Sequence, residues 1–168
     1  MERIQKAENL FLNGCNCAQA VLTAYHDVIG LSEEQAMKLA SSFGAGMGRM
    51  REVCGACSAA FMIAGLLCGY ADAGDDKAKA EHYRLIQQMA ERFKQQHGTI
   101  LCRELLQGIK TDTSPTPSAR TAEYYKQRPC VRFVRTAAEI VEEFLLSERE
   151  KEEKHLPKAG KSGIMTVE

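Results

Sequence analysis

The chain has 168 residues, which is enough for about one domain with a single hydrophobic core. Its 22 Lys and Arg side chains balance 22 Asp and Glu side chains, so the formal net charge is zero, and 45% of the residues are apolar. This composition excludes wholesale disorder and argues against a nucleic-acid-binding protein that neutralises phosphates.

The first predicted element is an amphipathic helix over residues 3–12, in which charged side chains are interspersed with Ile4, Leu10 and Phe11. The N-terminus has neither the apolar core of a secretory signal nor a twin-arginine motif. We therefore expect a cytoplasmic protein. In that reducing compartment, cysteines are more often metal ligands or redox groups than structural disulfides.

Two further helices are predicted to begin at capping residues. Asn16 caps the first of them, Gln19 completes a capping box, and apolar residues recur at helical spacing as far as Val28. Ser32 caps the next helix, which is predicted to end at Gly44.

An uncharged segment follows at residues 53–71. It is almost long enough to cross a bilayer, but it is rich in Gly, Ala, Ser and Cys rather than in Leu and Ile. Small residues let neighbouring helices approach closely. We therefore expect a helix buried at the centre of a bundle, and no membrane span.

The C-terminal half contains three more predicted helices, at residues 77–97, 99–106 and 129–146, and Gly98 ends the first of these. A loop with two prolines, residues 111–118, lies between the last two. No segment alternates like a strand. The predicted fold is all-α, a single-domain bundle of about five to seven helices around the uncharged one.

Charged residues crowd together near the C-terminus, while apolar residues become rare. We therefore divide the chain into a helical domain at residues 1–147 and, at residues 148–168, a charged helix end with a mobile tail.

Four of the seven cysteines fall at predicted helix starts. The free amide groups and the positive dipole end of a first turn favour thiolate over thiol, and the same groups can bond to metal-bound sulfur. One such cysteine is often only a small buried hydrophobe, but four on separate helices favour a shared site. Their spacing matches neither a zinc finger nor a ferredoxin, so tertiary packing must assemble the site. The four are Cys17, Cys54, Cys102 and Cys130.

The other three cysteines have different surroundings. Cys57 follows Cys54 by three residues, which places both on one helix face as a candidate redox dithiol. Thioredoxin-like proteins place such a pair after a strand, and this sequence has none there. Cys68 is predicted to lie in the core, and Cys15 is interpreted as an incidental loop residue or a spare ligand.

A glycine-rich segment, residues 43–48, precedes Cys54 and leads into Arg49 and Arg51. It lacks the preceding strand and the Gly-Lys-Ser/Thr ending of a nucleotide phosphate loop. We expect the glycines to let the backbone pass close to Cys54 and a cofactor, and the two arginines to offset thiolate charge. The glycines predicted to contact the cofactor are Gly46, Gly48 and Gly55.

Taken together, the cysteine segments resemble a known family. Residues 16–21 resemble the first signature of the C_GCAxxG_C_C family of redox-active proteins, which four cysteines define. Residues 44–48 with 53–56 resemble its central signature, and the segments that begin at Cys102 and Cys130 resemble its third and fourth.

The resemblance spans residues 3–145 and departs from the family pattern at two positions. The family's glycine three residues after Ala56 is Ala59 here, and Cys57 occupies a variable position of the motif. The resemblance implies a helical redox protein that carries an iron-sulfur cluster, and it implies no particular substrate.

Three functions are compatible with these patterns. In the first, Cys17, Cys54, Cys102 and Cys130 bind an iron-sulfur cluster for electron transfer or redox sensing, because soft thiolates select iron-sulfur or zinc. In the second, a cofactor-free thiol-disulfide oxidoreductase uses Cys54 as nucleophile and Cys57, or another helix-start thiol, to resolve the mixed disulfide. The third is a structural zinc protein or a small-molecule-binding bundle. The electron-transfer partner is unknown, and a homo-oligomer could complete a site that is open on one side.

Overall fold

The structure, a computed structural model, describes residues 2–155. Within this range it contains eight helices and one isolated β-bridge, which confirms the predicted all-α class. The last helix passes the predicted boundary at residue 147 without a break, and the predicted tail from residue 156 onward lies outside the described residues. The helices are α1 (Glu2–Leu12), α2 (Cys17–Ala24), α3 (Glu33–Ser41), α4 (Gly55–Cys68), α5 (Asp76–His97), α6 (Cys102–Leu105), α7 (Ala122–Gln127) and α8 (Cys130–His155).

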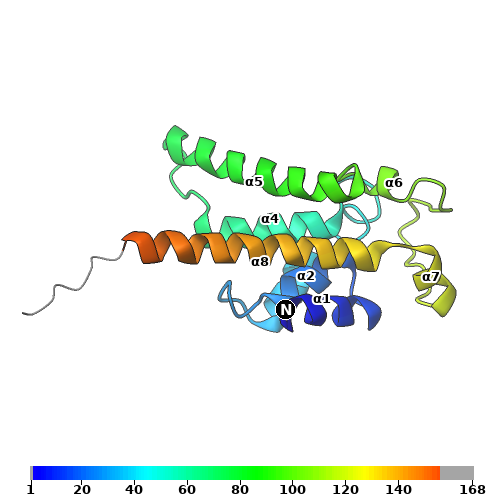
Figure 1. Cartoon of the computed structure of the whole chain (residues 1–168). Coiled ribbons are helices and arrows are strands. Elements are labelled where there is room, and N and C mark those ends of the chain that lie inside the picture. The colour runs from blue at the N-terminus through cyan, green and yellow to red at the C-terminus, as the bar shows by residue number, and fades with distance from the viewer. Residues whose placement is uncertain (1, 156–168) are drawn as a thin grey trace, which may run out of the picture.

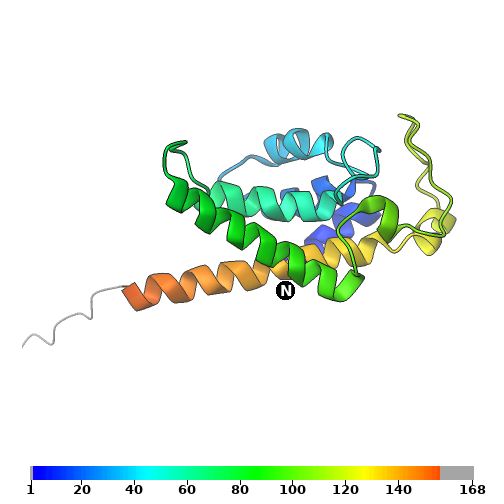
Figure 2. The same ribbon diagram turned by 90° about the horizontal axis from the view of Figure 1, so that it is seen from above.

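Helices α2 and α4 form the centre of the bundle (Figure 1). Helix α2 packs against α1, α3, α4 and α8, and α4 packs also against α5 and α8. Figures 1 and 2 show α8 as the long helix that runs the length of the molecule, with α6 and α7 at the end where α4 and α8 begin. This end of the bundle therefore gathers several helix starts.

Small apolar side chains allow the central helices to approach closely. Helix α4 carries no charged residue, and Ala56, Ala59, Ala60 and Ala64 are each at most 2% exposed. The uncharged segment is thus a buried bundle helix, as predicted. Within residues 2–155, no helix combines the length and apolar character needed to cross a membrane.

The predicted caps define the starts of α2 and α3. The Asn16 side chain accepts hydrogen bonds from the Ala18 and Gln19 amides at 3.0 and 2.9 Å, and the Asn16 amide donates to the Gln19 side chain at 3.1 Å. Ser32 and Gln35 form the same reciprocal arrangement at α3. Local side chains therefore fix both helix starts.

A short antiparallel pairing joins the segment before α4 to the segment before α6. The Cys54 amide donates to the Ile100 carbonyl at 2.8 Å, and the Cys102 amide donates to the Glu52 carbonyl at 2.7 Å. The sequence predicted that this helix begins at Thr99. The pairing explains why α6 begins at Cys102 instead. It also holds two of the cysteines side by side at the starts of their helices.

Two regions differ from the sequence prediction. Helix α7 was not predicted from the sequence. Its six residues have no buried side chain and so show no apolar repeat, and only the Thr121 cap marks its start. Cys68 is the last residue of α4 and is exposed, as is Leu66 at 50%. The prediction of a core position for Cys68 is wrong, because the final turn of α4 extends out of the packed centre.

Candidate functional site

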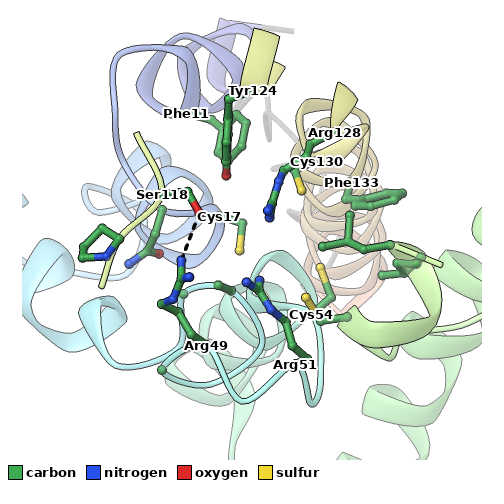
Figure 3. A pocket seen from close by; sticks show the side chains of 18 of the residues that line it. Phe11, Cys17, Arg49, Arg51, Cys54, Ser118, Tyr124, Arg128, Cys130 and Phe133 are labelled. Carbon is green, nitrogen blue, oxygen red and sulfur yellow. Dashed lines mark hydrogen bonds between the residues drawn. The ribbon is translucent and has the colours of Figure 1, made fainter. Parts of the chain in front are cut away.

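The structure brings the four helix-start cysteines to one cavity of about 310 Å³ (Figure 3). Cys17 begins α2, Cys54 caps α4, Cys102 begins α6 and Cys130 begins α8. Four segments that are far apart in the sequence thus place a thiol at the same cavity. The arrangement does not by itself identify what these thiols bind.

Cys17 and Cys54 lie at the junction of α2 and α4, where their thiols hydrogen-bond each other. The amides of Ala45 and Gly55 lie at the Cys17 sulfur, the Ala56 amide lies at the Cys54 sulfur, and each lowers the pKa of the thiol beside it. Three backbone donors therefore lie beside two sulfur atoms. Such donors stabilise a thiolate or a metal-bound sulfur.

The hydrogen bonds among the cysteines, together with burial, set the acidity of this pair of thiols. For Cys17, the hydrogen bond with Cys54 and burial raise the pKa well above its usual value. For Cys54, the hydrogen bond from Cys17 lowers the pKa, but the hydrogen bond with Cys57 and burial outweigh it, and the pKa is also well above its usual value.

For the other two thiols of the cavity, burial is the largest effect on the pKa. Burial raises the pKa of Cys102, and it raises the pKa of Cys130 to about 12. All four thiols therefore keep their protons at neutral pH. The amide groups at the helix starts lower the pKa of Cys17 and Cys54, as expected, but the opposing effects of burial and of the neighbouring thiols are larger.

The loop between α3 and α4 makes a left-handed turn. Residues 45–49 all have positive φ, between 54° and 71°, and Arg51 has φ 64°. This conformation costs a residue other than glycine roughly 1–2 kcal/mol, and Ala45, Met47 and Arg49 adopt it within the turn. Strain of this kind gathers at functional sites. Here it carries the Ala45 amide to the Cys17 sulfur.

The glycines of the sequence motif give this loop its close contacts. A Cβ atom added at Gly46 would lie 2.7 Å from the Cys102 Cβ, and one added at Gly55 would lie 2.8 Å from the Cys17 Sγ. Gly48 lines the cavity. Side chains would therefore clash at Gly46 and Gly55, whereas a Cβ at Gly48 would lie no closer than 3.8 Å to the Ser42 carbonyl oxygen.

Gly44 has a role that the sequence analysis did not assign. A Cβ atom there would lie 2.5 Å from the Cγ of Asn16, the residue that caps α2 just before Cys17. The Gly-x-Gly-x-Gly spacing of the loop was the signal that could have pointed to it.

Arginine side chains surround the cysteines. Arg51 is only 5% exposed, donates to the Asp112 carbonyl at 3.1 and 2.8 Å, and hydrogen-bonds the Cys102 sulfur. Arg49 binds the Asp112 carboxylate at 2.9 Å and thereby lowers its pKa. Both arginines were expected beside the thiols. Arg120 and Arg128 also line the cavity, and no motif in the sequence marks them.

The proline-containing loop closes one side of the cavity. Pro115, Pro117 and Ser118 line it. Arg49 holds this loop in place by donating to the Ser114 carbonyl and, at 3.3 Å, to the Ser118 hydroxyl (Figure 3). The turn that approaches Cys17 therefore also anchors the cover of the cavity.

The remaining cysteines lie outside the cavity lining. Cys57, in the first turn of α4, is 2% exposed and hydrogen-bonds Cys54. The Cys15 carbonyl accepts a hydrogen bond from Arg120 at 3.2 Å, and Cys68 lies at the other end of α4. Across residues 2–155, no three His, Cys, Asp or Glu side chains are grouped closely enough to hold a metal ion.

Comparison with known families identifies the chain's relatives. A family model described as "Putative redox-active protein (C_GCAxxG_C_C)" matches residues 15–144, which is most of the chain. No curated protein and no solved structure matches the chain. The chain belongs to the C_GCAxxG_C_C family.

Proposed function

We propose that in this member of the C_GCAxxG_C_C family, Cys17, Cys54, Cys102 and Cys130 bind an iron-sulfur cluster for electron transfer or redox sensing. The observation that carries the proposal is that thiols from four separate helix starts line a single cavity. Among the described residues that line it, none is His, Asp or Glu. A donor set made only of thiols suits iron-sulfur clusters, for which cysteine is the usual ligand.

The surroundings of the thiols suit an anionic group. The amides of Ala45, Gly55 and Ala56 lie beside the sulfurs of Cys17 and Cys54 and lower the pKa of these thiols, and Arg51 hydrogen-bonds the Cys102 sulfur. Hydrogen bonds to ligand sulfur and burial are the properties by which proteins adjust a cluster's reduction potential.

Binding requires two changes in the thiols. They must lose their protons, since burial raises the pKa of each one. They must also draw closer together, because no three metal-binding side chains of the described chain are grouped around one point. A bound cation favours both changes, since it stabilises thiolates in a buried site.

The size of the cavity favours a cluster over a single zinc ion. Four thiolates enclose zinc directly, with zinc-sulfur distances of about 2.3 Å, so a structural zinc site leaves little space. The cavity measures about 310 Å³ and extends past the cysteines to the proline-containing loop. A group of several atoms fits this space better.

The test is to purify the protein anaerobically and assay iron and acid-labile sulfide, with absorption spectra before and after dithionite. We expect iron and sulfide in the wild type, a visible absorption that dithionite bleaches, and a strong loss of iron in Cys17→Ser, Cys54→Ser, Cys102→Ser and Cys130→Ser. Cys68→Ser is the matched control, because Cys68 is exposed at the far end of α4. Stoichiometric zinc without iron, or equal loss in the control, would contradict the proposal.

A second candidate is a cofactor-free thiol-disulfide oxidoreductase, which the hydrogen bonds of Cys54 to both Cys17 and Cys57 favour. The Cys54 thiolate would attack a substrate disulfide and release one thiol. Cys57 would then attack the mixed disulfide, which releases the second thiol and leaves Cys54 and Cys57 as a disulfide. The Cys57→Ser variant distinguishes the two candidates. If the four cysteines bind a cluster, this variant should keep its iron. If Cys54 and Cys57 act as a redox dithiol, the protein should be colourless and the variant should lose disulfide reductase activity.

A further inference from the structure

The cavity beside the cysteines carries more positive charge than its protein contacts offset. Four arginines line it, and of these four only Arg49 forms an ion pair with a described residue, Asp112, at 2.9 Å. Arg51, Arg120 and Arg128 form none there. In Figure 3 the guanidinium groups of Arg49, Arg51 and Arg128 point toward the same space as the Cys17 sulfur.

Arg120 supplies an independent sign of a missing acceptor. Its Nη1 atom is buried and has no hydrogen-bond partner. The rest of the guanidinium is fixed, because Nη2 donates to the Cys15 carbonyl at 3.2 Å and the group lies 4.7 Å from the ring centre of Tyr124 and 4.9 Å from that of Phe11. A buried donor without a partner is rare in folded proteins and destabilises them, so such a group calls for an explanation.

Polar donors other than arginine face the same space. The Tyr124 side chain points its hydroxyl into the cavity, and the Ser118 hydroxyl lies beside Arg49 (Figure 3). Arg128 lies 4.9 Å from the ring centre of Tyr124, which holds its guanidinium in place at the cavity. Donors that converge from several directions suit a ligand with several oxygen atoms.

We infer that the cavity binds a small inorganic oxyanion next to the cysteines, with Arg120 and Arg128 as its charged contacts and Ser118 and Tyr124 as hydroxyl donors. The guanidinium of Arg120, which has one donor without a protein partner, belongs to the lining of the cavity in which the anion would bind. The binding of this anion does not depend on the proposed function.

The test is isothermal titration calorimetry with sodium sulfate, which thiols do not reduce, at constant ionic strength on the full chain with and without the cluster. We expect saturable binding at one site in both forms. Arg120→Gln and Arg128→Gln should each weaken binding about tenfold or more, because each removes a charge-assisted hydrogen bond. Arg92→Gln is the control with the same loss of charge, since Arg92 pairs with Glu143 at 2.7 Å on the outer faces of α5 and α8.

The outcomes separate the oxyanion site from the cluster. If sulfate does not bind saturably, or binds both cavity variants as tightly as the wild type, the oxyanion site is wrong. If loading the cluster abolishes sulfate binding, the arginines serve the cluster's charge and the inference also fails. If sulfate binds while iron and sulfide cannot be loaded, the oxyanion site holds and the proposed cluster fails. Circular dichroism of each variant identifies any that do not fold, and the other arginine variant then decides.

Discussion

The two ends of α4 carry cysteines in opposite settings. At the start of the helix, Cys54 is 4% exposed and hydrogen-bonds Cys17 and Cys57. At the end, Cys68 is exposed and donates only to the Ala64 carbonyl of its own helix, at 3.2 Å. A cysteine of this helix thus lines a cavity or lies at the surface, depending on whether other segments of the chain pack against it.

The largest expected effect is the difference in stability between two separate glycine-to-alanine variants, one at the start of α4 and one near its end. In Gly55→Ala, the new Cβ would lie 2.5 Å from the Phe43 carbonyl oxygen and 2.8 Å from the Cys17 Sγ, so we expect destabilisation by about 3 kcal/mol. In Gly65→Ala, the nearest atom outside the helix is the His82 Nε2 at 4.0 Å, so we expect a gain of about 0.5–1 kcal/mol from the helix propensity of alanine. Urea denaturation measures both. Equal effects would show that the cysteine end is no more tightly packed than the other.

A second comparison enlarges one side chain inside the packed part of α4 and truncates one beyond it. Ala60→Leu should destabilise the protein by about 1–3 kcal/mol, because Ala60 is only 2% exposed. Leu66→Ala should change stability by less than about 0.5 kcal/mol, because Leu66 is 50% exposed. Thermal unfolding of both variants tests this, and an unchanged melting temperature in Ala60→Leu would place that face outside the core.

The last comparison concerns the pH dependence of stability. Burial raises the pKa of Cys130 to about 12, whereas an unfolded chain has a cysteine pKa of about 8.5. The folded state therefore keeps a proton that the unfolded state loses. The stability that this proton provides is complete below pH 8.5 and declines as the pH rises toward 12.

In metal-free protein, Cys130→Ser should flatten this decline by about 1.4 kcal/mol per pH unit, which corresponds to one proton. Cys68→Ser should change the slope less, because Cys68 is exposed and its thiol titrates more nearly as it does in the unfolded chain. Urea denaturation between pH 8 and pH 10 provides the measurement. Identical slopes in the wild type and Cys130→Ser would contradict the burial of this thiol.

Features that depend on neighbours in the sequence could be predicted from it. Asn16 and Ser32 each form a capping box with the residue three positions later, and Gly98 ends α5 with a φ of 81°. The four helix-start cysteines followed from these boundaries. Each of these features is set within about one helical turn, which is the range over which local patterns act.

Features that depend on distant segments could not be predicted. The pairing that joins Cys54 to Ile100 replaces the expected start of α6, and nothing near Cys54 announces it. Arg120 reaches the cavity because α7 and the proline-containing loop fold back over it, and no motif surrounds that arginine. The protonation of the thiols likewise follows from burial, which is a property of the whole bundle.

The left-handed turn stores conformational energy at one point of the backbone, and a chain is apt to yield where it is strained. Arg49 and Arg51 belong to or adjoin this turn and hold the proline-containing loop, while Ala45 of the same turn contacts Cys17. A local change in the conformation of this turn would therefore both open the cavity and move the Ala45 amide away from the Cys17 sulfur. The turn would then control both access to the cavity and one of the donors to the Cys17 sulfur.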